Sequence, residues 1–145
     1  MAPPAATDYT LQSAMPDPAP ETPLPGKRIL LAEDDPAMGE LLKHVLGQEG
    51  FQVMLAKDGM AALSMIREQV PHLILSDVML PKMDGFKLCR LIKFDSALRH
   101  IPYIFLTART EDRDRETAMQ AGANAYVTKP IQNQALVALI RKHLG

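Results

Sequence analysis

The chain has 145 residues, of which 47% are hydrophobic and 23% are charged, and its formal net charge is -1. This length suffices for one domain with a full hydrophobic core, and the near-neutral charge gives no reason to expect nucleic acid or an anionic membrane as a direct partner. The single cysteine, Cys89, excludes an internal disulfide, and no apolar run is long enough for a membrane helix. Because one cysteine cannot form an internal disulfide, we expect a reducing, cytoplasmic location, and the first residues lack the basic and apolar regions of a secretory signal.

Residues 1–26 differ in composition from the rest of the chain. They contain seven prolines, three acidic residues and no lysine or arginine, and their large apolar residues are scattered. Proline removes amide donors and interrupts helices, so this composition predicts a disordered or partly extended tail. Two roles stay open for it, a linker or docking segment and N-terminal sequence without a function. Residues 27–145 are expected to form the folded domain.

From residue 27 onward, apolar runs alternate with amphipathic segments five times. The first three runs predict strands at residues 28–32 and 51–56 and a third strand, 73–76, that ends on Asp77. The run at 51–56 alternates more than the others, which is typical of an edge strand. Between the strands, helices are predicted to begin at Asp35-Pro36 and at Asp58-Gly59, because Asp caps free amides and Pro fits the first turn. The second helix is expected to bury Ala62, Leu63, Ile66 and Val70.

The second half of the chain repeats the pattern. A helix is expected from about Asp84 to Phe94, then strands at residues 101–106 and 125–128, and a last helix with Leu136, Leu139, Ile140 and Leu144 on its apolar face. The helix around residues 111–121 is unusual, because its first half is polar and leaves only Ala118, Met119 and Ala121 to bury. A helix with so few anchors should be among the least stable elements.

Strands that alternate with helices of this length predict an α/β fold with a parallel sheet and helices on both faces. Five strands and five helices fit the flavodoxin-like doubly wound order 2-1-3-4-5. In such a sheet the carboxyl ends of all strands meet at one edge, and open α/β sheets bind their ligands there.

Five polar residues follow the strands at that edge, namely Glu33, Asp34, Asp77, Thr107 and Lys129. Clustered carboxylates repel one another unless a cation neutralises them, and oxygen ligands select a hard ion such as Mg²⁺, with Mn²⁺ as the alternative. A divalent ion beside Asp77 would screen an incoming phosphoryl group, so that the carboxylate could attack phosphorus. Lys129 could then pair with the phosphoryl oxygens and Thr107 could donate a hydrogen bond to them. Each residue alone has an ordinary structural explanation, but together they indicate a phosphoryl-transfer site.

Four segments of the chain carry a resemblance to a known family: Ile29–Asp35, Asp77 with Met79–Gly85, Leu106–Arg109 and Tyr126–Pro130. They resemble the receiver domain of bacterial two-component response regulators, in the same order and at similar separations, over about residues 27–145. The resemblance implies that Asp77 accepts a phosphoryl group from a histidine kinase or a phosphotransfer protein. It also implies that Asp34, Asp77 and the backbone carbonyl of Met79 hold Mg²⁺, with Glu33 acting mostly through water.

The resemblance further implies a switch. On phosphorylation Thr107 would move toward the phosphoryl group and Tyr126 would turn inward into the vacated space. The face formed by the fourth helix, the fifth strand and the fifth helix would thereby change and bind a downstream protein, or a second copy of the chain. In this family the Lys129-Pro130 peptide bond is expected to be cis.

Met79 and Arg109 lie two residues beyond Asp77 and Thr107. In the receiver arrangement they would flank the path of the water molecule that hydrolyses the phosphoryl group. We therefore expect this bulky pair to slow dephosphorylation relative to receivers with small polar residues at these positions.

Three other functions stay open at this point. The chain could be a receiver cut from a hybrid histidine kinase or a longer regulator instead of a stand-alone regulator. It could be a degenerate receiver that serves as a scaffold without phosphorylation. It could also be an enzyme such as a phosphatase with an aspartyl-phosphate intermediate, but those enzymes usually place a second acid where Met79 stands. The leading interpretation is a signalling switch and not an enzyme.

Overall fold

The computed structural model describes residues 26–145, so the conformation expected for the tail at residues 1–26 lies outside the described residues apart from Gly26. One five-stranded sheet forms the centre, with all pairings parallel and the order β2-β1-β3-β4-β5. Its strands are β1 (Arg28–Ala32), β2 (Gln52–Ala56), β3 (Leu73–Ser76), β4 (Tyr103–Thr107) and β5 (Ala125–Thr128). The flavodoxin-like order is therefore confirmed, and β2, the strand with the most alternation, lies at an edge.

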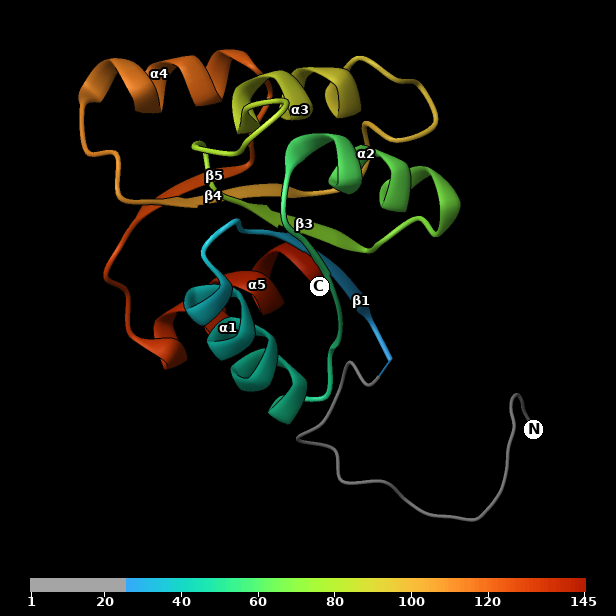
Figure 1. Cartoon of the computed structure of the whole chain (residues 1–145), viewed down its shortest axis with the longest axis vertical. Coiled ribbons are helices and arrows are strands. Elements are labelled where there is room, and N and C mark those ends of the chain that lie inside the picture. Colours follow the sequence, from blue (N-terminus) through green and yellow to red (C-terminus); the bar gives the residue numbers. More distant parts are fainter. Residues whose placement is uncertain (1–25) are drawn as a thin grey trace.

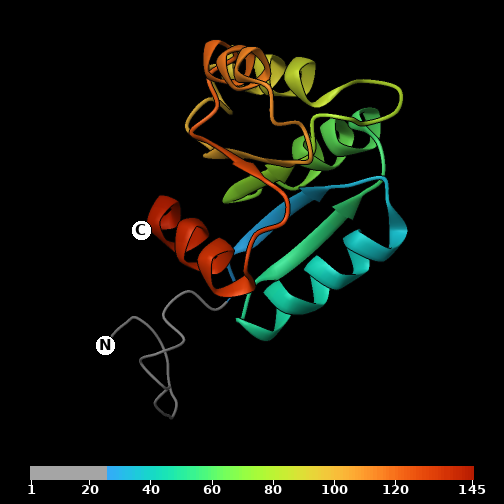
Figure 2. The same cartoon turned by 90° about the vertical axis from the view of Figure 1, so that its left-hand side faces the viewer.

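Helices cover both faces of the sheet, as Figures 1 and 2 show. One face carries α1 (Pro36–Gln48) and α5 (Asn133–Leu144). The other face carries α2 (Gly59–Glu68), α3 (Gly85–Lys93) and α4 (Asp112–Gln120). None of these helices is long and apolar enough to span a bilayer.

Two hydrophobic clusters result from the alternation of side chains along the buried strands. Leu30, Ile74 and Phe105 point toward α2, α3 and α4, whereas Leu31 and Leu75 point toward α1 and α5. β3 and β4 are buried along their whole length, because helices cover them on both sides. The polar residues that follow these strands are thus fixed to a rigid, fully packed centre.

The starts of three helices are set by aspartates that the sequence pattern had singled out. Asp35, Asp58 and Asp84 cap α1, α2 and α3 and accept hydrogen bonds from backbone amides at 3.0, 2.7 and 2.9 Å respectively. Neither α4 nor α5 has a side-chain cap of this kind.

Three apolar residues that follow the helical spacing of a buried face are exposed, and the first of them is Leu41 on α1. The helix α2 ends at Glu68, so Val70 lies beyond it and is exposed. On α4, Ala118 and Ala121 are buried as expected, but Met119 is exposed because it lies one residue further around the helix. The Lys129-Pro130 peptide bond is cis, as expected.

Candidate functional site

Glu33 and Asp77 lie side by side because of the register between β1 and β3. Ala32 pairs with Ser76, so the residues that follow directly leave the sheet next to each other at its carboxyl edge. The backbone amide of Asp77 donates to the carbonyl of Ala32 at 3.0 Å, and that of Glu33 donates to Ala56 at 2.9 Å. The sheet itself therefore holds the two carboxylates in place.

Lys129, directly after β5, reaches across to both carboxylates. Its Nζ lies 2.8 Å from Oε1 of Glu33 and 3.1 Å from Oδ2 of Asp77. Burial opposes the charge of Lys129, but its hydrogen bonds to Glu33 and Asp77 outweigh this cost and raise the pKa of Lys129. The ammonium therefore stays charged at neutral pH and places one positive charge between two acids, of which Glu33 is only 3% exposed.

The orientation of the Asp77 carboxylate is set by a contact at each of its oxygens. Its Oδ1 accepts the backbone N–H of Met79 at 3.2 Å, while Oδ2 faces Lys129. α3 begins at Gly85, directly against the backbone carbonyl of Asp77, where any Cβ atom would collide with that carbonyl. The glycine of the Asp84-Gly85 turn thus permits the close approach. Asp77 keeps 8% of its surface exposed and can be reached from solvent.

The donors expected for a metal ion are at this edge. Asp34 is exposed and, with Met79, lines an open hollow of about 330 Å³ that Leu80, Pro81 and Asp84 complete. In residues 26–145, no three His, Cys, Asp or Glu side chains are placed to hold a metal ion as they stand. The ammonium of Lys129 instead supplies the positive charge between Glu33 and Asp77. Carboxylates and a backbone carbonyl are oxygen donors, which are the ligands that Mg²⁺ prefers.

Thr107 and Tyr126, the two residues expected to form a switch, are joined through the backbone of Arg109. Thr107 is the last residue of β4, is fully buried, and accepts the backbone N–H of Arg109 at 3.3 Å. Tyr126 lies on the neighbouring strand β5, with its ring buried, and donates its hydroxyl to the carbonyl of Arg109 at 2.8 Å. Burial raises the pKa of Tyr126, so its hydroxyl remains a donor. The tyrosine ring therefore lies inward in this structure.

Arg109 also makes a contact that the sequence pattern did not predict. Its Nε and Nη2 each lie 3.0 Å from an oxygen of Asp114 on α4, and its Nη1 lies 2.8 Å from the sulfur of Met79. Asp114 is only 5% exposed, although it belongs to the polar half of its helix. A signal was present, because Asp114, Ala118 and Ala121 follow the spacing of one helical face.

The electrostatics of this pair follow from its geometry. The hydrogen bond to Asp114 raises the pKa of Arg109, and the hydrogen bond from Arg109 lowers the pKa of Asp114. The next residue, Arg115, places its guanidinium 4.9 Å from the centre of the Tyr126 ring and donates to the backbone carbonyl of Tyr126 at 3.0 Å. Two arginines thus tie α4 and the loop before it to β5 and to Met79, beside Asp77 at the carboxyl edge of the sheet.

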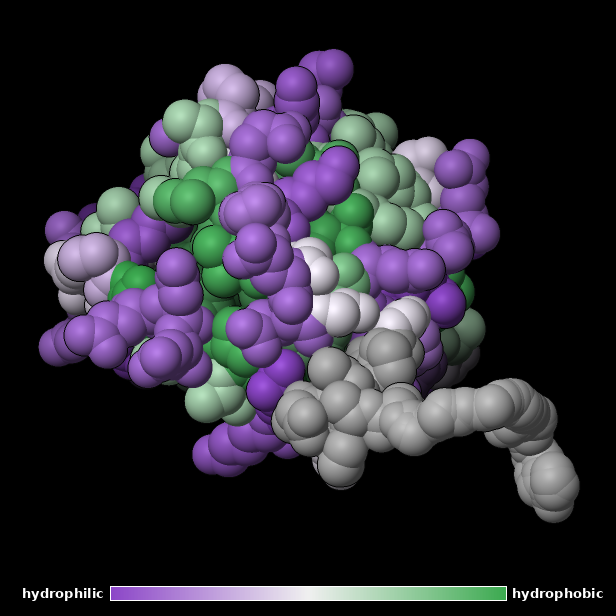
Figure 3. All heavy atoms as spheres, turned by 90° about the horizontal axis from the view of Figure 1, so that it is seen from below, coloured by the Kyte–Doolittle hydropathy of each residue, from purple (hydrophilic) through white to green (hydrophobic). Residues whose placement is uncertain are grey.

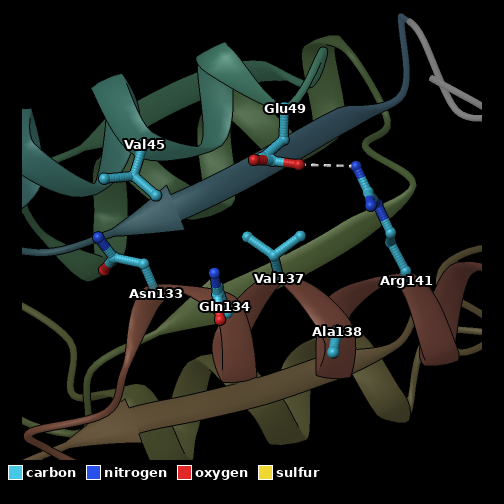
Figure 4. A pocket seen from close by; sticks show the side chains of 7 residues that line it. All are labelled: Val45, Glu49, Asn133, Gln134, Val137, Ala138 and Arg141. Atoms are coloured by element: carbon cyan, nitrogen blue, oxygen red, sulfur yellow. Dashed lines mark hydrogen bonds and ion pairs between the residues drawn. The ribbon is translucent and has the colours of Figure 1, made fainter. Parts of the chain in front are cut away.

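Two further hollows lie between α1 and α5. One, of about 270 Å³, is crossed by an ion pair between Glu49 and Arg141 at 2.8 Å, and none of its lining residues belongs to the predicted site (Figure 4). The other, of about 150 Å³, is mostly apolar and adjoins Lys129, with Met38, Leu41, Leu106 and Pro130 among its walls. Seen from below Figure 1, hydrophobic surface shows between ridges of hydrophilic side chains (Figure 3).

The site and the fold together define a doubly wound α/β domain with an aspartate, a lysine and a threonine at the carboxyl edge of its sheet. The family model of the response regulator receiver domain matches residues 29–141. The chain therefore belongs to the response regulator receiver domain family, whose members are signalling switches of two-component systems.

Curated relatives agree with this assignment. The chain is 42% identical over 118 residues to the DNA-binding response regulator MtrA of Mycolicibacterium smegmatis, which covers 81% of this chain and 50% of MtrA. It is 42% identical over 114 residues to the response regulator PleD of Caulobacter vibrioides, which covers 79% of this chain and 25% of PleD. The chain thus spans about half the length of the MtrA relatives and less of PleD.

Solved structures of similar fold include receiver domains of histidine kinases. The signal receiver domain of a histidine kinase from Syntrophus aciditrophicus is 37% identical, with a TM-score of 0.78 over 82% of this chain and 90% of that one. The receiver domain of the sensor histidine kinase PA1611 from Pseudomonas aeruginosa PAO1 is 35% identical, with a TM-score of 0.77 over 83% and 98% of the two chains. That structure has a magnesium ion coordinated in its active site cleft.

Proposed function

We propose that Asp77 is the phosphoryl acceptor of this receiver. The observation that carries the proposal is the contact of the Lys129 ammonium with both Glu33 and Asp77. A carboxylate oxygen of Asp77 attacks the phosphorus of a phosphohistidine, an O–P bond forms and the N–P bond breaks. The imidazole nitrogen takes the electron pair and then a proton from solvent. Lys129 pairs with the phosphoryl oxygens, and the Thr107 hydroxyl donates to them.

We propose Mg²⁺ as the cofactor, with Mn²⁺ as a substitute, held by Asp34, Asp77 and the backbone carbonyl of Met79, and by Glu33 through water. The bound ion would supply positive charge beside the phosphoryl oxygens. The hollow that Asp34 and Met79 share supports this assignment, as does the carboxylate character of the donors. Lys129 meanwhile lies between Glu33 and Asp77 and contacts both carboxylates.

The output proposed for the phosphorylated chain is a changed protein-binding face on α4, β5 and α5. Thr107 would leave the backbone of Arg109 and bond to the phosphoryl group. Because the hydroxyl of Tyr126 donates to the carbonyl of Arg109, a movement of this loop would also move the side chain of Tyr126. The hydrogen bonds of Thr107 and Tyr126 to one residue, Arg109, support such a linked movement. The target is a downstream protein or a second copy of the chain, with no direct role for nucleic acid or membrane.

The proposed donor is a histidine kinase or a phosphotransfer protein. We call the carboxyl edge of the sheet around Asp77 the acceptor edge. On its α1 side lie the mostly apolar hollow beside Lys129 and the exposed side chain of Leu41. Such an apolar surface suits contact with a protein that delivers a phosphoryl group. Receivers occur among the relatives both in regulators and in histidine kinases, so the receiver at residues 27–145 is compatible with either setting. The buried thiol of Cys89 suits a reducing cytoplasm.

The proposed switch acts on its own phosphoryl group and not on an external substrate. We propose that Met79 and Arg109 slow the loss of that group. The contact between Nη1 of Arg109 and the sulfur of Met79, at 2.8 Å and beside Asp77, supports this role. Replacing both by small polar residues, as in Met79→Asn with Arg109→Ser, should shorten the phosphoryl half-life.

The test of the acceptor is the intact mass of the protein after incubation with acetyl phosphate and Mg²⁺. We expect one phosphoryl adduct on the wild type, none without Mg²⁺, and none on Asp77→Asn. Asp95→Asn serves as the matched control, because it changes an acid that follows the far end of α3, away from Asp77, and should retain the adduct. A folded wild-type protein that gives no adduct under these conditions would favour the scaffold function instead.

A further inference from the structure

Arg109 makes four contacts that connect the acceptor edge with α4. Its backbone N–H bonds to Thr107, its carbonyl accepts from Tyr126, and its guanidinium contacts both Met79 and Asp114. The first three contacts concern residues already placed in the site. The role of Asp114 is unexplained by the function proposed so far.

The pair with Asp114 fixes the position of the Arg109 side chain. A guanidinium is planar, so the two hydrogen bonds from Nε and Nη2 to the two carboxylate oxygens leave it one orientation. The remaining nitrogen, Nη1, then lies at the sulfur of Met79. Because Met79 is 56% exposed and its own amide bonds to Asp77, this contact lies at the entrance to the acceptor.

We propose that Asp114 is a positioning residue for the acceptor site, which holds Arg109 against Met79 and thereby prolongs the life of the phosphoryl group. The proposal rests on the proposed function of Asp77. In the hydrolysis that it slows, a water oxygen bonds to phosphorus, the acyl–phosphate O–P bond breaks, and the carboxylate of Asp77 leaves with the electron pair. The proton of the water passes to the released phosphate or to solvent.

The position of Asp114 on α4 adds a consequence. The same ion pair that holds Arg109 at the acceptor also holds α4 against the loop after β4. A partner that binds α4 and breaks the pair of Asp114 with Arg109 would therefore shorten the phosphoryl lifetime, because it would release Arg109 from its position against Met79.

The experiment compares phosphoryl half-lives. Each protein is loaded with acetyl phosphate and Mg²⁺, freed of the donor, and followed by intact mass. We expect Arg109→Ala and Asp114→Asn each to shorten the half-life at least about threefold, and the double variant to lose no more than Arg109→Ala alone, because the two residues act as a unit. The side chains of Asn and Asp are of the same size, so we expect Asp114→Asn to keep α4 folded. Glu111→Gln is the control, because it removes only the exposed pair of Glu111 with Arg113.

A charge swap, Arg109→Asp with Asp114→Arg, separates positioning from stability. The swap restores an ion pair between the loop and α4 but takes the cation away from Met79. We expect it to recover the midpoint of thermal unfolding and to keep the short half-life.

The outcomes distinguish the two proposals. A wild-type protein without an adduct overturns the role of Asp77 and, with it, that of Asp114. A normal adduct with an unchanged half-life in Asp114→Asn overturns the positioning role alone. The positioning role is also overturned if the double variant shortens the half-life by the sum of the two single effects. A charge swap that restores the full half-life overturns it as well.

Discussion

At the scale of single residues, the acceptor edge depends on the charge of Lys129. Glu33 and Asp77 are both nearly buried, and in the described part of the chain the ammonium of Lys129 is the cation that contacts both. Two carboxylates this close would repel each other in a region that water screens poorly. The lysine thus stabilises the two carboxylates and is already in place for a phosphoryl group.

We predict that Lys129→Met lowers the free energy of unfolding by about 2–3 kcal/mol, since it leaves two nearly buried carboxylates without a counter-ion. Adding Asp77→Asn to this variant should recover part of the loss. Urea unfolding at pH 7 without divalent ions measures both values. The matched control is Lys82→Met, which removes an exposed lysine 3.7 Å from Asp58 and should cost little. Equal losses for the two lysine variants would contradict this view of the site.

The ion pair of Asp114 with Arg109 predicts a specific pH dependence. Arg109 lowers the pKa of Asp114 in the folded protein, so the pair contributes stability above the unfolded pKa of about 3.9 and loses it as pH falls through the folded value. The unfolding free energies of wild type and Asp114→Asn should therefore differ by a constant amount between about pH 5 and 7 and converge below about pH 4. Urea unfolding across this range measures the difference. A difference that persists undiminished at pH 3 would show that size or packing, and not charge, distinguishes the variant.

At the scale of elements, α4 is the helix with the fewest buried residues. It has no side-chain cap, and its buried residues are Asp114 and Ala118, whereas α3 has an Asp84 cap and four buried residues. Its anchoring therefore depends on polar contacts that a rearrangement of the acceptor loop can alter. This is the property that a two-state switch requires.

Hydrogen exchange tests this difference between the helices. We predict that backbone amides of α4 exchange faster than those of α3, because local opening of α4 exposes little apolar surface. Asp114→Asn should accelerate exchange in α4 further and leave α3 unchanged. Comparable protection of the two helices in the wild type would contradict the prediction.

The elements could be predicted from the sequence because their signals are local. Apolar runs, Asp caps and strand-terminating polar residues determined the order of strands and helices, and the topology then determined which polar residues meet. The errors at Val70 and Met119 concern which side of a helix, or which residue past its end, faces the sheet. That depends on packing between elements, which periodicity alone does not specify.

The acceptor edge was predictable for the same reason, and its outer contacts were not. Glu33, Asp77 and Lys129 meet because parallel strands align their ends. The contacts among Met79, Arg109 and Asp114 depend instead on the conformation of two loops, and loops have no periodic signal. The spacing of Asp114 with Ala118 and Ala121 indicated a common helical face, but the polar composition of the segment outweighed this signal.

At the scale of the whole molecule, the two helical layers meet the acceptor edge from opposite sides. Lys129 leads from β5 into α5 on one face, while Met79 and Gly85 lead from β3 into α3 on the other. An ion bound by Asp34, Asp77 and Met79 would therefore link connections that follow different strands. Such a site exists only in the folded chain, so the ion should stabilise the whole domain.

We predict that Mg²⁺ raises the free energy of unfolding of the unphosphorylated wild type. At an ion concentration one hundred times the dissociation constant, the increase should be about 2.7 kcal/mol, because a ligand of the folded state alone adds RT ln(1 + [L]/Kd). Asp34→Asn removes a proposed ligand that is exposed and lies outside the contacts of Lys129, so it should abolish most of the increase without a large effect of its own. Thermal or urea unfolding with and without MgCl₂ measures the effect.

The control for this prediction is NaCl at matched ionic strength, because screening of surface charges also shifts stability. The ion should compete with Lys129 for Asp77, so the increase in Lys129→Met should equal or exceed that of the wild type. A rise that NaCl reproduces, or one that Asp34→Asn retains in full, would contradict a site at Asp34. The remaining outcome is an increase in the free energy of unfolding that is lost in Asp34→Asn and kept in Lys129→Met. This result would assign different roles to the two cations, with Lys129 paired to Glu33 and Mg²⁺ bound to Asp77.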